Sequence, residues 1–247
     1  MKTVGIIPAR YQSSRLPGKP LVDICGKPMI WWVYQEALRV REIDEIFVAT
    51  DDDRISRVCG SYGMKVLMTS SNHRTHIERI HEASNMVEAD YFVVICGDEP
   101  LIKAEAISHV IPNKNPDGKM FVKALMRHFS DPAETIDPGN IKIVTNNQDE
   151  CIYLSRTPIP YPYKTVQFKY KKIVGIECYD KRALDYFVSK EPGELERIED
   201  ITLLRFVEHG YSIQFKLIHS DSISVDTEKD LEKVRAIMSQ RLEIQSI

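Results

Sequence analysis

The chain has 247 residues, of which 43% are hydrophobic and 28% are charged, which is enough for one sizeable hydrophobic core. Its formal net charge of −3 provides no basic field, so we expect no nucleic-acid partner. The five cysteines include no C-x-x-C pair, which argues against a disulfide framework or a zinc site and favours free thiols. No apolar run approaches the roughly 20 residues of a membrane span, so we expect a cytoplasmic protein with no membrane partner.

Strands and helices are expected to alternate in the first half of the chain. Residues 3–9 (TVGIIPA) are apolar without alternation, which is typical of a strand buried on both faces. Residues 28–40 have apolar side chains at helical spacing, and one face of this expected helix carries Ile30, Val33, Ala37 and Leu38. Further strands are expected at 44–52, 65–69 and 91–102, and further helices at 53–63 and 76–87. This order predicts an α/β fold with a mostly parallel sheet and helices on both faces.

The second half has a different pattern, in which strands alternate with longer loops from about residue 120. Strands are expected at 120–129, 140–146, 151–161 and 171–180, and helices at 182–190, 194–209 and 228–242. No internal repeat or low-complexity linker separates the halves, so we expect a single domain over residues 1–247. Within this domain, residues 1–120 form the α/β half and residues 121–247 form a β-rich elaboration.

Polar segments are expected at the carboxyl ends of the first-half strands. They are PARYQSSRLPGKP (8–20), ATDDDR (49–54), TSSNHRTH (69–76) and GDEP (97–100). Ligands of open parallel sheets bind outside the carboxyl ends of the strands. The sequence therefore predicts a ligand site where these four segments meet.

The first of these segments concentrates positive charge. Arg10, Arg15 and Lys19 lie within ten residues, and Gly18 permits close approach of the backbone. Two guanidinium groups, one ammonium group and backbone N–H donors suit a polyphosphate. The Walker pattern G-x-x-x-x-G-K-[ST] is absent, so this is not a P-loop. The alternative is a solvated surface loop with incidental charges.

Acidic residues that could hold a divalent metal follow two expected strands. Asp98, with Glu99 beside it, comes after a buried strand and a glycine, and Asp226 lies in the later stretch SISVDTEKDLEKV. Magnesium takes one or two protein carboxylates together with water and phosphate oxygens. For Asp226 the alternative is a helix N-cap, because an acid before a helix is a capping signal. A nucleoside triphosphate with Mg²⁺ as cofactor would suit phosphoryl or nucleotidyl transfer, which depends on positioning and charge neutralisation.

The stretch IPARYQSSRLPGKPLVDICGKPMI resembles the signature of the CMP-Kdo synthetase family, the cytidylyltransferases that activate 3-deoxy-manno-octulosonate (Kdo). Later family motifs occur in the same order, namely VATDDDRI, GMKVLMT, GDEPLI, DPGNIKIV, YLSRTPIPY and SVDTEKDLE. The resemblance covers nearly the whole chain. It implies a domain of the nucleotide-diphospho-sugar transferase (GT-A-like) type, usually a homodimer. It also implies that residues 1–120 bind CTP and that residues 121–247 serve acceptor binding and dimerisation.

The resemblance implies that a hydroxyl of the acceptor attacks the α-phosphorus of CTP and that pyrophosphate leaves. The residues implied to bind the nucleotide are Pro8, Ala9, Arg10, Ser14, Arg15, Lys19 and Arg79. Catalytic roles fall to Lys19, Arg10 and Asp98, and Mg²⁺ would be held by Asp98 and Asp226.

The chain departs from the family pattern on the side expected to bind the acceptor. The family motif His-x-Ser-Gly-Thr-(Asp/Glu)-Arg is HRTHIER here, at residues 73–79, and glutamine before GDEP is replaced by cysteine. Polar family positions are occupied by Ile173, Glu177, Thr202 and Leu203. Candidate ligands of a small anionic acceptor are therefore Arg74, His76, Arg156 and Glu177.

Three functions follow from these departures. The first is CMP transfer from CTP to Kdo or a similar sugar acid. The second is the same reaction on a different acceptor, such as a phosphonate or a sugar or polyol phosphate. The third is a nucleotide-binding protein without catalysis, against which the retained Lys19, Asp98 and Asp226 argue. The aromatic stretch YPYKTVQFKYKK, residues 161–172, is the expected homodimer surface.

Overall fold

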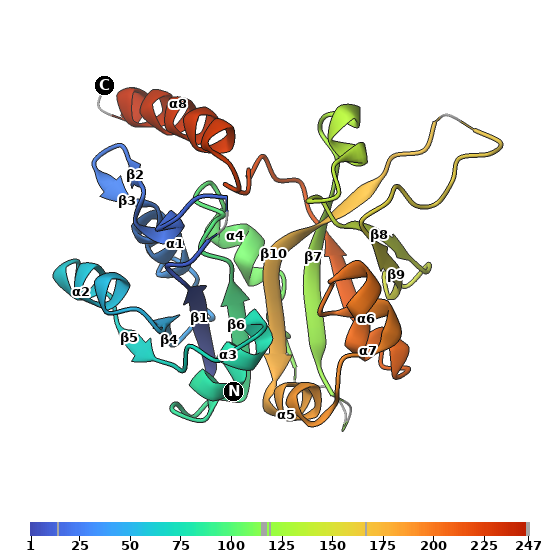
Figure 1. Ribbon diagram of the computed structural model, residues 1–247, viewed down its shortest axis with the longest axis horizontal. Coiled ribbons are helices and arrows are strands. Elements are labelled where there is room, and N and C mark those ends of the chain that lie inside the picture. The colour runs from blue at the N-terminus through green and yellow to red at the C-terminus, as the bar shows by residue number, and fades with distance from the viewer. Residues whose placement is uncertain (14, 115–117, 119, 166, 246–247) are drawn as a thin grey trace.

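One sheet runs through both halves of the chain (Figure 1). The computed structural model describes residues 1–13, 15–114, 118, 120–165 and 167–245. In these residues the sheet has nine strands in the order β11-β7-β10-β6-β1-β4-β5, with β8 and β9 attached through β10. The strands are β1 (Thr3–Ala9), β4 (Glu45–Thr50), β5 (Val66–Met68), β6 (Tyr91–Ile95), β7 (Val122–His128), β8 (Lys142–Thr145), β9 (Cys151–Ser155), β10 (Lys171–Asp180) and β11 (Gln214–Leu217). A separate ribbon pairs β2 (Asp23–Ile24) with β3 (Lys27–Pro28).

The strands of the first half of the chain pair in parallel, and in the second half β11 also pairs in parallel with β7. β1 pairs in parallel with both β4 and β6, and β5 pairs in parallel with β4. β10 then runs antiparallel to both β6 and β7, which joins the second half to the first. The predicted parallel sheet is therefore confirmed, and the predicted β-rich elaboration continues it through antiparallel pairing.

Helices cover both faces of the sheet, as predicted. The helices are α1 (Met29–Ala37), α2 (Asp53–Ser61), α3 (His76–Ser84), α4 (Ala104–Ser108), α5 (Lys181–Ser189), α6 (Glu194–Glu199), α7 (Leu204–Glu208) and α8 (Glu228–Gln245), with 3-10 turns at Lys19–Leu21 and Pro132–Ile136. Residues of α1, α2 and α4 belong to one hydrophobic cluster, and residues of α3, α5 and α7 to another. No helix of the described chain is long and apolar enough to cross a membrane.

The central strand β1 contributes to both clusters. Val4 and Ile6 belong to the cluster with α3, whereas Ile7 and Ala9 belong to the cluster with α1. Adjacent side chains of a strand point to opposite faces, so an unbroken apolar run is what a strand covered on both sides requires.

The predicted apolar face of α1 is correct for three of its four residues. Ile30, Val33 and Ala37 are fully buried, but Leu38 is 55% exposed. Leu38 is the cap residue of α1 and its backbone is still helical, with its N–H bonded to the carbonyl of Tyr34, so its side chain lies at the exposed edge of the buried stripe.

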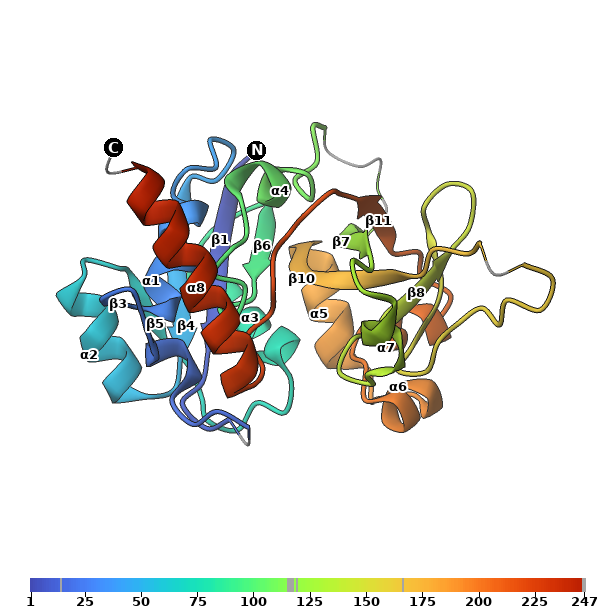
Figure 2. The same ribbon diagram turned by 90° about the horizontal axis from the view of Figure 1, so that it is seen from above.

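The last helix, α8, returns to the first half of the chain. Figures 1 and 2 show it beside α1 and the β2–β3 ribbon, after a long connection from β11. Its buried residues Leu231, Val234 and Met238 share a third hydrophobic cluster with Ile24 and Met29. This packing matters for the site because Asp226 lies just before the helix.

The helical segment expected at 194–209 is divided into α6 and α7. Asp200 separates them in the left-handed conformation, with φ 51°. Glu196 and Arg205 hold the two helices together through hydrogen bonds of 2.6 Å from Nε to Oε2 and from Nη2 to Oε1. The buried ion pair explains the break, because a straight helix would carry these two side chains apart. It also fixes the position of the turn at residues 200–202.

Candidate active site

A cleft of about 420 Å³ lies at the carboxyl ends of β1 and β6, at the sheet edge where the sequence predicts a ligand. The predicted site residues that line it are Pro8, Ala9, Arg10, Arg15, Lys19, Arg74, His76, Arg79, Asp98 and Asp226. Ser14, a predicted nucleotide ligand, lies outside the described residues. Arg156 and Glu177 are predicted site residues that are not part of the cleft lining.

The loop after β1 is folded back on itself. Gly18 has φ 69° and its N–H donates to the carbonyl of Tyr11 at 2.9 Å. A Cβ at this position would lie 3.2 Å from the Tyr11 ring, so glycine is required both for the left-handed backbone and for the close contact. The closed loop places Lys19 at the cleft. Arg10, at its other end, makes no hydrogen bond or ion pair within the described residues and is free to bind an anion.

Lys19 joins the two predicted metal ligands. Its Nζ donates to Asp98 Oδ2 at 2.7 Å and to Asp226 Oδ1 at 3.2 Å. Arg15 Nη2 also donates to Asp226 Oδ1, at 3.0 Å. Burial, the largest influence, acts to lower the pKa of Lys19, but the two carboxylates together raise it above its ordinary value. The ammonium group is therefore firmly charged, and the two acids converge on one cation.

This geometry fits the predicted Mg²⁺ site. Two hard carboxylate ligands that approach a single cation are the protein contribution that Mg²⁺ usually takes, with phosphates and water completing the shell. The backbone supports the pairing, because Val225 N donates to the carbonyl of Asp98 at 2.9 Å and so ties the two acidic segments together. The acids are 26% and 31% exposed, so both can be reached by a ligand in the cleft.

Asp226 is not the N-cap of α8. The cap is Thr227, whose Oγ1 accepts from Asp230 N at 3.3 Å while Asp230 Oδ2 accepts from Thr227 N at 2.9 Å. This reciprocal arrangement is a capping box. The alternative role considered for Asp226 is thus filled by its neighbour, and its carboxylate faces Lys19 instead.

Glu99 does not join Asp98 in the lining of the cleft. Its carboxylate accepts from the Ser222 hydroxyl and from Gly175 N, the latter at 3.5 Å. Glu99 is 6% exposed, and burial raises the pKa of its carboxyl group. The side chain of Glu99 is therefore used inside the fold, and Asp98 is the acid of this segment that lines the cleft.

Arg74 of the segment 69–76 and Arg79 of α3 differ in burial. Arg79 is 6% exposed, donates to Thr69 Oγ1 at 2.6 Å and pairs with Asp51 Oδ1 at 3.2 Å. Arg74 has a side chain that is 66% exposed, and its Nη2 lies 3.3 Å from Glu78 Oε1. The side chain of Arg79 is therefore held in place at the cleft, whereas the exposed side chain of Arg74 can move.

The structure does not bring Arg156 into the cleft. Its guanidinium group donates to three backbone carbonyls, at 2.5 Å to Glu199, 2.9 Å to Pro138 and 2.8 Å to Asp200. In this arrangement the guanidinium group is held by those carbonyls, and the prediction that Arg156 clamps the acceptor stays a prediction. Its hydrogen bonds hold the turn that presents Asp200 and Thr202 to the cleft.

The four unusual acceptor-side residues lie in different environments. Of these, only Thr202 lines the cleft. Leu203 is 2% exposed inside the hydrophobic cluster with α3, and Ile173 packs against the same cluster. Those two residues therefore replace family polar groups at positions that this fold uses for packing.

Glu177 lies behind His76 and not at the cleft surface. His76 Nε2 is 3.1 Å from Glu177 Oε2, and the Tyr179 hydroxyl donates to the same oxygen at 2.6 Å. The carboxylate of Glu177 is engaged by these two partners, and a direct contact between Glu177 and the acceptor stays a prediction. Tyr179 was not predicted as a functional residue, although its position two residues after Glu177 on the same face of β10 was a usable signal.

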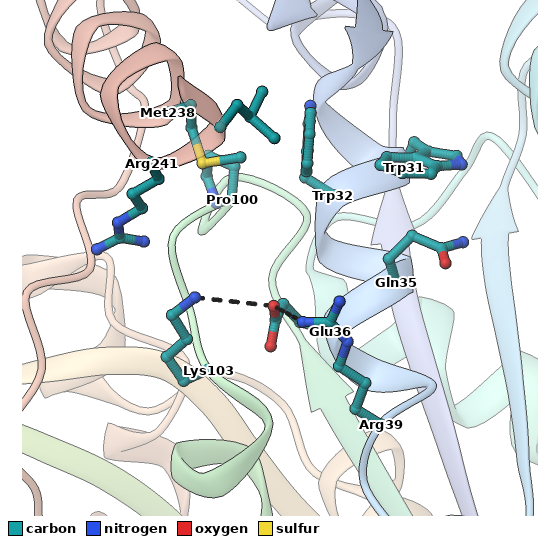
Figure 3. Close-up of a pocket in the computed structure, with 10 residues that line it drawn as sticks. Trp31, Trp32, Gln35, Glu36, Arg39, Pro100, Lys103, Met238 and Arg241 are labelled. Carbon is teal, nitrogen blue, oxygen red and sulfur yellow. Dashed lines mark hydrogen bonds and ion pairs between the residues drawn. The ribbon is translucent and has the colours of Figure 1, made fainter. Parts of the chain in front are cut away.

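A second hollow, of about 130 Å³, lies between α1 and α8 (Figure 3). Trp32 of α1, Met238 of α8 and Pro100 line it. The sequence predicts core packing for the tryptophans, and Trp32 packs against the cluster that holds α8. Since Pro100 follows Asp98 closely and α8 follows Asp226, this junction supports the segments that carry both acids.

The cleft, the cationic loop and the paired acids define a nucleotidyltransferase site on an α/β sheet. The family model described as "Cytidylyltransferase" matches residues 4–218. A 3-deoxy-manno-octulosonate cytidylyltransferase of Escherichia coli is 39% identical over 98% of both chains. An 8-amino-3,8-dideoxy-manno-octulosonate cytidylyltransferase of Shewanella frigidimarina is 38% identical over 94% of this chain and 97% of its own.

A solved structure of CMP:2-keto-3-deoxy-manno-octonic acid synthetase complexed with CTP superposes with a TM-score of 0.91 and 38% identity, covering 98% of this chain and 100% of the other. The chain belongs to the CMP-Kdo synthetase family of cytidylyltransferases. The predicted class of enzyme is thereby confirmed, and a nucleotide-binding protein without catalysis is not the function of this family.

Proposed function

We propose that this protein transfers CMP from CTP to a hydroxyl of Kdo or a closely similar octulosonate and releases pyrophosphate. The observation that carries the proposal is the convergence of Asp98 and Asp226 on Lys19 in a cleft beside the cationic loop. Relatives that are 38–39% identical over nearly the full length take octulosonates by name, which favours this acceptor over a phosphonate or a polyol phosphate.

The donor half of the cleft, defined as residues 8–20 with Asp98 and Asp226, would bind the triphosphate. Arg10 is unpaired within the described residues, and Arg15 and Lys19 can exchange carboxylate oxygens for phosphate oxygens. The acceptor oxygen forms a bond to the α-phosphorus, the bond from that phosphorus to the bridging oxygen breaks, and the hydroxyl proton passes to solvent. Lys19 is the cation placed to offset negative charge at the reacting phosphate.

Mg²⁺ is part of the proposal, with Asp98 and Asp226 as the residues that would hold it. When bound, it would neutralise charge on the phosphates and on the leaving pyrophosphate. Lys19 would then be released from at least one of its carboxylate partners and could turn toward the nucleotide.

A pyrophosphate-release assay with CTP and Mg²⁺ tests the proposed function. Release with Kdo or its 8-amino analogue, and slow release with phosphonates and polyol phosphates, is the expected result. Rapid release only with a phosphonate or a polyol phosphate would replace the acceptor. No release with any acceptor, despite CTP binding, would overturn catalysis itself.

The homodimer is also proposed, through the stretch that contains Tyr161, Tyr163 and Phe168. These side chains are 82%, 86% and 38% exposed, and a group of exposed aromatic residues is typical of an interface. Light scattering of the purified chain should give twice the monomer mass. Changing Tyr161 and Tyr163 together to serine should shift the mass toward the monomer, whereas an unchanged dimer would place the interface elsewhere.

A further inference from the structure

We propose that His76 donates a hydrogen bond from Nδ1 to the carboxylate of the sugar-acid acceptor, and that Glu177 and Tyr179 position it for this role. The proposal rests on the proposed function, because it takes the acceptor to be a sugar acid. It makes His76 a specificity-determining residue and Glu177 and Tyr179 positioning residues, which act through the imidazole ring.

The hydrogen bonds leave one ring nitrogen for a ligand. Glu177 Oε2 accepts from the Tyr179 hydroxyl at 2.6 Å and lies 3.1 Å from His76 Nε2. An ionised carboxylate only accepts, so the proton of the imidazole lies on Nε2 in this contact. Nδ1 has no partner within the described residues, and His76 lines the cleft. The contact with Glu177 therefore fixes the orientation of the imidazole ring and leaves Nδ1 available to a ligand in the cleft.

The fold explains why these three residues meet. His76 is the first residue of α3, whose N-cap is Thr75, while Glu177 and Tyr179 lie on one face of β10. The register of β10 against β7 shifts between Val174 and Glu177, and such an irregularity re-aims the side chains that follow. The first residue of α3 and strand β10 therefore meet beneath the cleft, where His76 contacts Glu177.

Charges around the ring favour its protonated form. The charged groups that face it are Glu177 from β10, Asp98 from the segment after β6 and Arg10 from the segment after β1. Burial is the largest influence and lowers the pKa of His76, and Arg10 acts in the same direction. Glu177 and Asp98 outweigh them and raise the pKa above its ordinary value. A protonated ring can donate from Nδ1 as well as from Nε2.

Glu177, the acidic partner of His76, is also shifted toward its charged form. Burial acts to raise the pKa of Glu177, but His76 and the Tyr179 hydroxyl lower it below its ordinary value. Glu177 is 6% exposed, so its charge is kept from the acceptor by the ring and the hydroxyl. The cleft therefore meets the imidazole ring and not the carboxylate behind it.

The cleft needs a cation at this position. A sugar acid that reacts in this cleft would add a carboxylate to a site that already holds Asp98 and would hold a triphosphate, and like charges in a partly buried site are costly unless they are paired. Four other cleft cations already have carboxylate partners, namely Arg15, Lys19, Arg74 and Arg79. Arg10 has no such partner within the described residues, but it belongs to the donor half and is assigned to the triphosphate, so His76 is the basic side chain outside the donor half whose second ring nitrogen is open to the acceptor.

The first experiment is steady-state kinetics of His76→Gln, which keeps a polar side chain but removes the charge. The KM for Kdo should rise about 10- to 100-fold, the size of a hydrogen bond to a charged group. The KM for CTP should stay within about twofold, because the donor half is unchanged. An unchanged KM for Kdo would overturn the inference.

The second experiment identifies the acceptor group. The wild-type protein should prefer Kdo to its methyl ester, which lacks the anionic carboxylate. In His76→Gln this preference should fall about tenfold, because the ester and the acid then meet the same neutral side chain. If the preference is unchanged, His76 does not contact the carboxylate.

The third experiment uses pH to test the role of Glu177. Because the pKa of His76 is raised, the donor is present below that pKa and kcat/KM for Kdo should fall as the pH rises through it. Glu177→Gln removes the charge that raises the pKa, so this decline should begin at a lower pH. Tyr179→Phe should move it less. An unmoved profile in Glu177→Gln would overturn the positioning role.

His81→Gln is the matched control, since His81 lies on the same helix and also pairs with a carboxylate, Asp185, at 2.9 Å but does not line the cleft. Its kinetics should equal those of the wild type. Thermal unfolding of each variant separates a folding defect from a kinetic one. Failure of the proposed function is distinguishable, because the wild-type protein itself would then release no pyrophosphate with Kdo.

Discussion

The donor half of the cleft and the side that carries His76 are assembled in different ways. Most of the donor half is one folded loop, in which Gly18 closes on Tyr11 and delivers Lys19. The His76 side depends on contacts between residues distant in sequence, such as His76 and Glu177, which are 101 positions apart. A single loop can keep its family motif while residues of a site made of distant partners change. This chain departs from its family on the His76 side.

The largest expected effect comes from breaking the donor half at Asp98. Asp98→Asn removes one of the two charges that converge on Lys19, and kcat should fall about 10³-fold, or about 4 kcal/mol of activation free energy. The fold should survive, because the side chain is 26% exposed and an amide has the same shape. Pyrophosphate release and circular dichroism check both statements.

Asp53→Asn, at an exposed position in the first turn of α2, is the control for this change and should keep wild-type turnover. Near-normal turnover of Asp98→Asn would show that Asp98 does not serve the reaction, and the proposed metal site would then be abandoned.

The donor half could be predicted from sequence because each of its parts carries a local sequence signal, although Lys19 and Asp226 are 207 positions apart. The loop, the strand before it and the acids at strand ends follow from charge, glycine placement and the strand–helix order. The role of Asp226 needed the structure, because a capping signal and a ligand signal overlap there and only the geometry gives the cap to Thr227.

For the His76 side of the cleft, the sequence could supply only a set of candidate residues. Arg156 and Glu177 have residue types that suit an anionic acceptor or a hydroxyl, but their partners are backbone carbonyls and buried side chains brought by tertiary folding. The division between α6 and α7 was not predicted, for the same reason. A helix boundary is decided by what packs at its end, and periodicity does not contain that information.

The second expected effect is on stability, at the pair that holds α6 to α7. Arg205 is 1% exposed, its guanidinium bonds Glu196 twice, and it also donates to the carbonyls of Phe187 and Lys190. Arg205→Met leaves the acid buried without its partner, which should lower the free energy of unfolding by about 3–5 kcal/mol. Urea unfolding measures this. The KM for CTP of the folded fraction should be unchanged. A specific loss of CTP binding would show that the pair between α6 and α7 also supports the donor half.

The third effect tests whether α8 supports the donor half. Leu231 is 1% exposed, and Leu231→Ala should cost about 2–5 kcal/mol of stability through the cavity that it leaves. Because α8 begins next to Asp226, the Mg²⁺ concentration for half-maximal activity should also rise. Ile244→Ala, on the same helix but 67% exposed, should change stability by less than about 0.5 kcal/mol. An unchanged Mg²⁺ dependence in Leu231→Ala would mean that α8 does not position the acid.

The smallest effect separates two roles for Arg156, and the comparison is with Arg74. If Arg156 supports the turn at residues 200–202, Arg156→Met should lower stability by about 1–3 kcal/mol, because three carbonyl groups lose donors. The KM for Kdo should then change by less than about threefold. Arg74→Met removes an exposed ion pair, so its stability should change by less than about 1 kcal/mol, and any effect should be on the acceptor. The opposite result, a stable Arg156→Met protein with an acceptor KM raised tenfold, would show that the guanidinium leaves its carbonyls when the acceptor binds. The turn at residues 200–202 would then move when the acceptor binds, in addition to supporting the site.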